Sequence, residues 1–186
     1  MSDSDPGQVI ALTRRWLERA VIGLDLCPFA GAVFRQGRIR YVVSGARDEA
    51  ALLADLAAEL QRLHQTDPAE VETTLLIHPD ALADFLDFND FLGVADAAVA
   101  TLGFEGELQV ASFHPRYRFA GTSPDDIGNA TNRSPYPTLH LLREGTVARA
   151  ADAYGGIEQI GERNAERLRR LGRDGWERLW QDPPQD

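Results

Sequence analysis

ELQVASFHPRYRFAGTSPDDIGNATNRSPYPTLHLLRE, residues 107–144, is the stretch that decides the fold, because it holds a long polar loop between two apolar runs. The run 107–112 predicts a buried strand, and the run 138–143 predicts another. About 20 residues connect them, whereas about 4–6 residues usually join neighbouring elements of a compact domain. Connections of that length are usually functional, so we expect the loop 114–137 to line the site.

The loop is rich in side chains that bind ligands and move protons. Histidines stand at its borders, with carboxylates, amides and arginines beside them: His114, His140, Asp125, Asp126, Asn129, Asn132, Arg116, Arg118, Arg133 and Arg143. Its four prolines, at positions 115, 124, 135 and 137, restrict the backbone and so reduce the entropy lost on ordering. We therefore expect a loop that holds a fixed shape.

The composition predicts one domain that spans residues 1–186 and frays after about residue 181, because 44% hydrophobic residues suffice for a sizeable core. The N-terminal residues MSDSDP are acidic, and no run approaches the roughly 18 apolar residues of a membrane span. A single cysteine, Cys27, excludes an intrachain disulfide and fits a reducing compartment. We expect a cytoplasmic protein without a membrane partner.

The charge pattern limits the classes of molecule that the protein is expected to bind. A net charge of −10 opposes binding to nucleic acid, because phosphate contacts need clustered cations. All 19 basic residues are arginines, which excludes enzymes that need a P-loop lysine or a Schiff-base lysine. Residues 113–144 carry four arginines against three acids, so 4 − 3 gives +1 within an acidic chain. This local excess indicates a small anionic ligand, unless these arginines only pair with neighbouring acids.

The order of apolar patterns predicts the fold class. Strands are predicted at 38–43, 72–77, 107–112 and 138–143, and helices at 6–23, 48–64, 85–102, 147–154 and 157–171. Two consecutive strand–helix–strand units imply at least three parallel strands with right-handed crossovers. The long loop returns the chain, so the last strand runs antiparallel. We predict a single α/β domain: a mainly parallel sheet of about four strands, with an antiparallel last strand and helices covering the sheet.

Three histidines are expected at one edge of this sheet. His78 follows the second strand and His114 follows the third, and ligands bind beyond the carboxyl ends of such strands. The antiparallel last strand begins at that edge, so its third residue, His140, should lie nearby. Three imidazoles can hold a divalent transition metal, zinc or iron, and leave a position open for water or substrate. The alternatives are strand-end turns with a core histidine, or a metal-free acid–base role for one or two of them.

Other side chains complete the candidate site. Cys27 is the only candidate thiol nucleophile, and its alternative role is that of a small buried hydrophobe. Asn164 interrupts the apolar stripe of the last helix, which indicates either that it reaches the site or that the helix is irregular. Arg133 is the candidate anion-binding residue, because Asn132 and the prolines around Tyr136 would hold its planar guanidinium in place.

The chain also resembles a known family. The motifs are LCPFA (26–30), LLIHPD (75–80), FLDFND (85–90), QVASFHP (109–115), FAGT (119–122), NATNRSPYPTLHLLRE (129–144) and ERN (162–164). They resemble bacterial domain-of-unknown-function family 1415, and the resemblance runs from about Leu26 to Trp176. It implies a cytoplasmic bacterial protein and supplies no activity, substrate or cofactor. One departure is Arg116, where the family pattern has an acid, which argues against a direct catalytic role for this position.

Taken together, these features predict an enzyme that acts on a small anionic carboxylate or phosphate by histidine acid–base chemistry, with or without a metal. A hydrolase, a lyase and an oxidoreductase all remain open. The expected catalytic residues are His114, His140, Asp126 and Cys27, with Asp126 orienting a histidine. The expected substrate-binding residues are Arg133, Asn129, Asn132, Ser134, Tyr136 and Asn164. The competing hypothesis is a non-catalytic protein that binds a metabolite in the same pocket.

Overall fold

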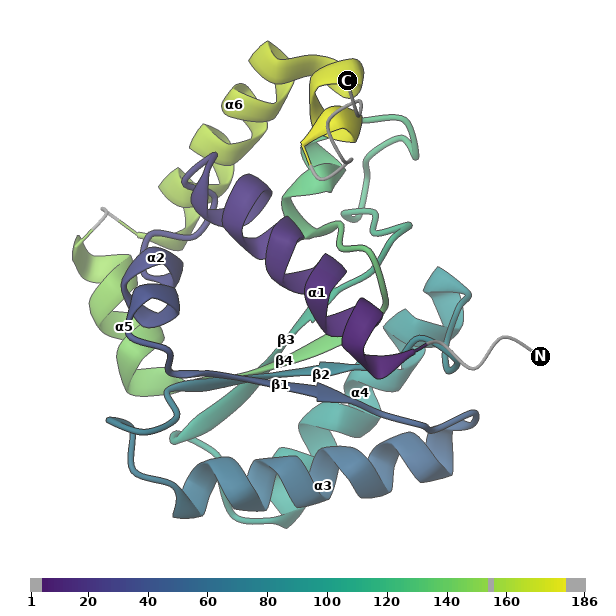
Figure 1. Ribbon diagram of the computed structural model, residues 1–186, viewed down its shortest axis with the longest axis vertical. Helices are drawn as coiled ribbons and strands as arrows, with labels where there is room; N and C mark the ends of the chain where they lie inside the picture. The colour runs from purple at the N-terminus through teal and green to yellow at the C-terminus, as the bar shows by residue number, and fades with distance from the viewer. Residues whose placement is uncertain (1–4, 154–155, 180–186) are drawn as a thin grey trace.

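The computed structural model describes residues 5–153 and 156–179 and shows one sheet with helices packed on both faces (Figure 1). The strands are β1 (Ile39–Val43), β2 (Thr73–Ile77), β3 (Leu108–Phe113) and β4 (Thr138–Arg143). Each strand begins within one residue of its predicted start. Short apolar runs bounded by turn residues are therefore sufficient to locate the strands of this chain.

The strand order in the sheet is β1-β2-β4-β3. β1 pairs with β2 in parallel, whereas β4 is antiparallel to both of its neighbours, so β1, β2 and β3 all run in the same direction. This arrangement confirms the predicted α/β sheet with an antiparallel last strand. The long loop allows β4 to insert between β2 and β3, and His140 consequently lies opposite Leu75 on one side and Ala111 on the other.

The helices and helical turns are α1 (Pro6–Trp16), η1 (Leu17–Ile22), α2 (Ala30–Arg35), α3 (Glu49–Gln65), α4 (Phe85–Thr101), η2 (Ile127–Asn132), α5 (Glu144–Ala153) and α6 (Ile157–Arg178). Asp5 caps α1 by accepting hydrogen bonds from the backbone N–H groups of Gly7 and Gln8, and Asp48 and Asp84 cap α3 and α4 in the same way. No helix in the described part of the chain is long and apolar enough to cross a membrane.

Four helical features differ from prediction. The single helix predicted to end near residue 23 continues from α1 into a π-helical segment, η1, and the short helix α2 was not predicted. α5 begins at Glu144 instead of being capped by Thr146, whose hydroxyl donates to Glu72. α6 extends past residue 171, with a kink at Gly172, where φ is 71°. The predicted break at Gly155, the side chain of Trp180 and the fraying tail lie outside the described residues.

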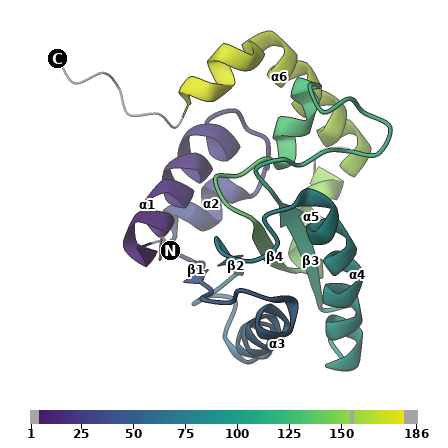
Figure 2. The ribbon, with the colours of Figure 1, turned by 90° about the vertical axis from the view of Figure 1, so that its right-hand side faces the viewer.

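Two cores cover the two faces of the sheet (Figures 1 and 2). Below the sheet in Figure 1, α3 and α4 pack on a core that includes Leu76, Leu139 and Phe88. Above it, α1 and α6 pack on a core that includes Leu75 and Phe113. Because successive residues of a strand point to opposite faces, Leu75 and Leu76 belong to different cores. The face to which a side chain points therefore decides which layer it can reach.

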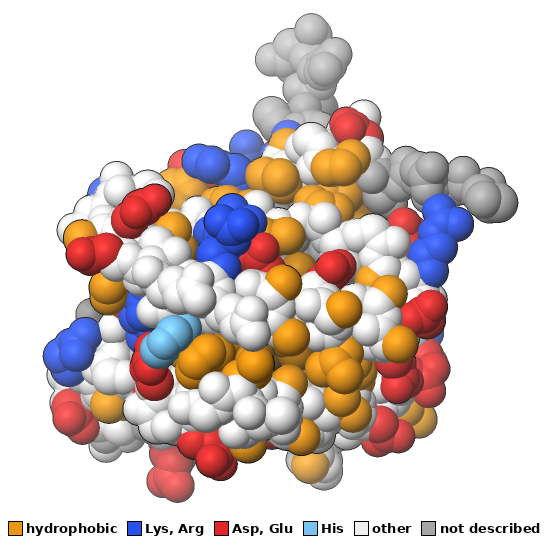
Figure 3. Space-filling view, turned by 90° about the horizontal axis from the view of Figure 1, so that it is seen from below, with side chains coloured by type: hydrophobic (Ala, Val, Ile, Leu, Met, Phe, Trp, Pro, Cys, Tyr) orange, Lys and Arg blue, Asp and Glu red, His pale blue; other side chains and the backbone are white. Residues whose placement is uncertain are grey.

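The surface below the sheet agrees with the acidic composition. Figure 3 views the molecule from this side and shows acidic side chains spread around its rim. The arginines visible on this face stand apart from one another. Such a distribution provides no continuous positive strip on this face.

Candidate functional site

The structure does not bring the three histidines together. His78 and His114 lie on the α4 side of the sheet, where their rings pack on Phe88 at centroid distances of 5.7 and 5.0 Å. His140 lies on the opposite face and packs on Phe113, with ring centroids 5.8 Å apart. His140 is also in the middle of β4, opposite Leu75, and not at the strand edge. The expectation of one shared site at the edge is therefore corrected.

His78 and His114 instead hold the turn that leads into α4. Nδ1 of His78 lies 3.0 Å from the Ala81 carbonyl, and Nε2 of His114 lies 3.2 Å from the Leu82 carbonyl. Nδ1 of His114 accepts a hydrogen bond from the Arg116 N–H. Leu82 has a φ of 55°, an unfavourable value for leucine, so these bonds stabilise a strained turn.

Burial keeps both of these histidines neutral. It lowers the pKa of His78 to about 4, although the hydrogen bond to Ala81 opposes the shift, and it also lowers the pKa of His114. Within residues 5–153 and 156–179, no group of three His, Cys, Asp or Glu side chains could hold a metal ion. The predicted ligand set of His78, His114 and His140 is therefore not assembled.

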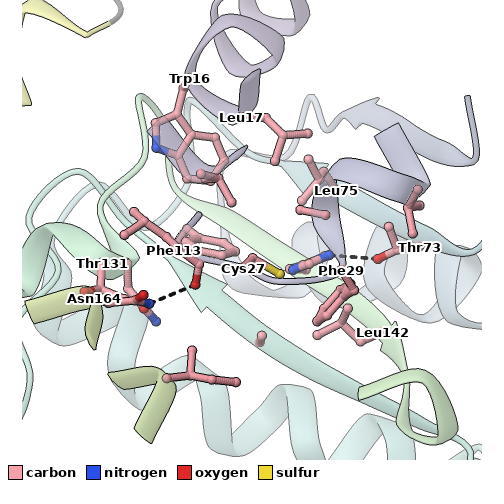
Figure 4. Close-up of a pocket in the computed structure, with 18 of the residues that line it drawn as sticks. Trp16, Leu17, Cys27, Phe29, Thr73, Leu75, Phe113, Thr131, Leu142 and Asn164 are labelled. Atoms are coloured by element: carbon pink, nitrogen blue, oxygen red, sulfur yellow. Dashed lines mark hydrogen bonds between the residues drawn. The ribbon is translucent and has the colours of Figure 1, made fainter. Parts of the chain in front are cut away.

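A cavity of about 360 Å³ lies on the other face of the sheet, between the sheet and α1 (Figure 4). Its walls come from all four strands, from α1, η1, α2 and α6, and from the loop, and most of its surface is apolar. Its polar and sulfur-bearing lining residues are Trp16, Cys27, Thr73, Thr131, Asn132, His140 and Asn164. Four of the predicted catalytic or binding residues thus share one cavity: Cys27, Asn132, His140 and Asn164.

His140 is the only histidine in this cavity. The hydroxyl of Thr73 lies 2.6 Å from the Leu141 carbonyl and 2.8 Å from Nε2 of His140, a contact drawn as a dashed line in Figure 4. Because the hydroxyl has one proton and gives it to the carbonyl, Nε2 carries a hydrogen and donates to Thr73. Burial lowers the pKa of His140 to about 4, so the ring is neutral at pH 7. Nδ1 then keeps a lone pair, with no protein donor among the described residues.

Cys27 lies in the turn before α2, and Figure 4 shows its sulfur near the rings of Phe113 and Phe29. Burial raises the pKa of its thiol to about 11, although the backbone N–H groups of Phe29 and Ala30 lower it in part. The thiol is therefore protonated at neutral pH. The protonated thiol can donate a weak hydrogen bond, but it is not activated as a nucleophile.

This assignment predicts slow alkylation of Cys27. Raising the thiol pKa from 9.0 to about 11 reduces the thiolate fraction roughly 100-fold at any pH well below 9. Iodoacetamide labelling of the folded protein at pH 7.5, followed by mass spectrometry, should therefore proceed at least about 100-fold more slowly than labelling in denaturant. Equal rates in the two conditions would contradict the buried, protonated thiol.

Asn164 fixes the turn that carries Cys27. Its side-chain N–H₂ donates to the Leu26 carbonyl at 2.8 Å, and one helical turn later Arg167 donates to the Asp25 carbonyl and pairs with the Asp25 carboxylate at 3.0 Å. Asp25 has a φ of 51°, so α6 holds a strained turn in place. Asn164 therefore has a structural reason to interrupt the apolar stripe of α6. Its side chain also lines the cavity, which agrees with the prediction that it reaches the site.

The π-helical segment η1 supplies Leu17 and Val21 to the cavity wall. π-Helical turns are rare and occur frequently at functional sites, because the extra residue per turn shifts side chains out of regular register. The adjacent Trp16 also lines the cavity, and its indole N–H is buried without a hydrogen-bond partner in the described structure. Because this N–H exposes almost no surface, it is a buried donor next to the cavity and not a group on the cavity wall.

The loop residues predicted to bind substrate mostly hold the loop itself. Arg133 donates to the carbonyls of Tyr117 and Pro124, and Asn129 accepts from the Phe119 N–H while it donates to the Ser123 carbonyl. The expected pairing of Asp126 with a histidine is not formed, because its carboxylate accepts from the Gly128 N–H and caps η2. Ser134 and Thr138 donate to the carbonyl of Tyr136.

Asn132 is the exception within the predicted loop set. Its side-chain N–H₂ donates to the Ser112 carbonyl at 3.1 Å, and the side chain lines the cavity next to Thr131. The residues that sequence reasoning missed are Trp16, Thr73, Phe113 and Thr131. They lie in ordinary helix, strand and turn patterns, so no local signal distinguished them from core residues.

The family resemblance is confirmed by comparison. A family model described as "Protein of unknown function (DUF1415)" matches residues 8–178. No curated protein and no solved structure matches the chain. The matched range includes every polar residue that lines the cavity.

Proposed function

The chain belongs to this family of proteins of unknown function, and we propose that it is an enzyme that binds a small, largely apolar molecule in the cavity and moves a proton through His140. The observation that carries the proposal is a cavity of about 360 Å³ whose apolar wall surrounds one oriented, neutral imidazole. Small-molecule sites are typically of this size, with a few polar groups that fix the orientation of the ligand.

The chemistry of the cavity favours a neutral substrate. No arginine, aspartate or glutamate is among its lining residues, and a buried charge without a partner is costly. The proposal therefore places a neutral molecule here instead of the anionic substrate expected from the sequence. The acceptor groups Nδ1 of His140 and the side-chain oxygens of Asn132 and Asn164 suit a ligand that carries a hydroxyl, an amide N–H or an acidic C–H group.

His140 has the features of a general acid–base residue. Its ring is oriented by Thr73, and its Nδ1 is left available to take a proton from the ligand and to return it. A base whose pKa is about 4 is weak, and a C–H proton next to a carbonyl group is only slightly acidic, so the transfer also requires stabilisation of the carbonyl oxygen where negative charge develops. Cys27 can contribute a hydrogen bond from its protonated thiol to the oxygen where negative charge develops.

A second candidate is a non-catalytic binding protein that uses the same cavity. The observation that favours it is that no carboxylate lines the cavity to stabilise the imidazolium that proton transfer would form. The two functions share the same ligand class and differ in whether His140 changes its protonation state during the reaction.

The test starts from a set of small neutral fragments, including phenols, amides and cyclic ketones, screened by thermal shift. Fragments that bind are then incubated with the protein in D₂O, and deuterium exchange at their acidic C–H positions is followed by NMR. The wild type should accelerate exchange, and His140→Gln should reduce the rate by about 10²–10⁴-fold while binding is retained. Binding without acceleration would establish the second candidate, and failure of every fragment to bind would contradict both.

We also propose a cellular location for the protein and a class of partner that it does not bind. A cytoplasmic location in a bacterium is supported by a single, protonated thiol, which needs no oxidising compartment, and by the motifs shared with the bacterial family. The net charge of −10 supports a function without nucleic acid.

A further inference from the structure

The loop 114–137 separates the cavity from a second hollow. Phe119 and Asn132 line the cavity, whereas their chain neighbours Arg118 and Arg133 line a cleft of about 390 Å³. This arginine cleft is completed by Arg116 from the loop and by residues at the start of α4. The two hollows thus lie on opposite sides of one loop wall.

The arginine cleft concentrates positive charge. Three arginines, Arg116, Arg118 and Arg133, line it together with one carboxylate, that of Asp84, so 3 − 1 gives a formal charge of +2. One oxygen of Asp84 accepts from the Leu86 N–H as the cap of α4, and the other lies 3.6 Å from Arg116. One carboxylate that already holds these two contacts does not neutralise three guanidinium groups. The cleft is therefore positive, although the net charge of the whole chain is −10.

Two of the three guanidinium groups are held in place by neutral acceptors. Arg116 donates to the Ala83 carbonyl at 2.6 Å, and Arg133 donates to the Tyr117 and Pro124 carbonyls at 3.2 and 2.7 Å. Hydrogen bonds to carbonyls fix the orientation of a guanidinium without neutralising its charge. The nearby carboxylates neutralise the two groups only in part: Asp84 lies 3.6 Å from Arg116, and Asp125, which acts on Arg133 together with Asp126, also pairs with Arg173. The side chain of Arg118 has no ion pair or hydrogen bond within the described parts of the chain.

These observations point to a negatively charged ligand, which would supply the counterions that the cleft lacks. We propose that the arginine cleft binds a small dianion, a phosphate monoester or a dicarboxylate, through the guanidinium groups of Arg116, Arg118 and Arg133. Planar guanidinium groups bind carboxylate and phosphate in a bidentate manner, and preorganised groups lose little entropy on binding. Phe85 and Leu86 also line the cleft, and Leu86 is 61% exposed, so an apolar substituent on the dianion gains a contact.

Isothermal titration at constant ionic strength tests this proposal with inorganic phosphate, phenyl phosphate and succinate. The wild type should bind at least one of these anions saturably. Comparison of the phosphates with succinate shows whether the cleft prefers a phosphate or a dicarboxylate. Arg118→Ala should weaken binding by about 10- to 100-fold, the usual range for a hydrogen bond to a charged group. This variant removes an exposed side chain with no hydrogen bond or ion pair in the described parts of the chain, so its fold should be unchanged.

Arg62→Ala is the matched control, because it removes one exposed arginine on α3, far from the loop in Figure 1. It should bind the anion within about twofold of the wild type. If Arg62→Ala and Arg118→Ala weaken binding equally, the effect comes only from the net charge of the protein and the cleft is not the site. Absence of saturable binding in the wild type would also overturn the proposal. Neither result bears on the cavity, whose test uses neutral fragments.

Discussion

Lowering the pH from 6.5 to 4 is expected to remove roughly 6 kcal/mol from the free energy of unfolding. Burial lowers the pKa values of His78 and His140 from 6.5 to about 4, so the folded chain resists protonation at both rings. A difference of 2.5 pH units corresponds to about 3 kcal/mol for each histidine. This loss is comparable with the total stability of about 5–15 kcal/mol of an ordinary domain.

Whether stability rises or falls with pH depends on which state, folded or unfolded, binds more protons. Between pH 6.5 and 4 the unfolded chain is protonated at these histidines and the folded chain is not, so stability falls as the pH falls. Above about pH 7.5 both rings are almost entirely neutral in both states, and they contribute little pH dependence. Between pH 6.5 and 5 most carboxylates remain ionised, so the histidines dominate in that window.

Urea unfolding at pH 6.5, 5.5 and 5.0 measures the effect. His140→Gln retains an N–H group that can face Thr73, and His78→Asn retains one that can face the Ala81 carbonyl, so each variant removes one titrating group. Each should remove a large part of the pH dependence in this window, and the remaining histidine contribution comes from His114, whose pKa is also lowered. An unchanged dependence in both variants would show that these rings do not control the acid response.

Closing the cavity should abolish fragment binding while the fold is retained. Gly161 lies on α6 at the cavity, and a Cβ atom built there meets nothing within 4 Å. Gly161→Phe therefore places a ring at the cavity without a backbone clash, and in a helix the change also removes the conformational cost of glycine. We expect complete loss of the thermal shift produced by neutral fragments.

Gly93→Phe is the control for this prediction. Gly93 lies in α4 on the other side of the sheet, and a Cβ atom there also meets nothing within 4 Å. Both variants should unfold within about 1 kcal/mol of the wild type, and only Gly161→Phe should lose fragment binding. Ala111→Phe, which fills the cavity from β3, should have the same effect on binding. Full binding in both cavity variants would place the fragment site elsewhere.

The elements of this fold were predictable because their signals are local. Apolar runs located the strands, and Asp5 and Asp48 are local N-cap residues at the starts of α1 and α3. The cap that Asp84 forms at the start of α4 was not predicted. The polar Asn164 on an apolar stripe was predicted either to reach the site or to mark an irregular helix, and it reaches the cavity while it donates to the Leu26 carbonyl.

The site was harder to predict because it depends on long-range pairing. The placement of His140 required knowing that β4 inserts between β2 and β3 and which face its third residue takes. The cavity is the space left between layers, so Thr73 and Trp16 show no special pattern in sequence. Loop residues such as Arg133 and Asp126 were predicted as ligand-binding groups because hydrogen bonds within a loop cannot be read from composition.

A crystal structure of the wild type with its tightest-binding neutral fragment tests the central claim most directly, which is that the cavity between α1 and the sheet is the ligand site. The account predicts the fragment inside the cavity, with a polar atom about 2.6–3.2 Å from Nδ1 of His140. A fragment bound outside the cavity, with His140 making no contact to it, would contradict the account.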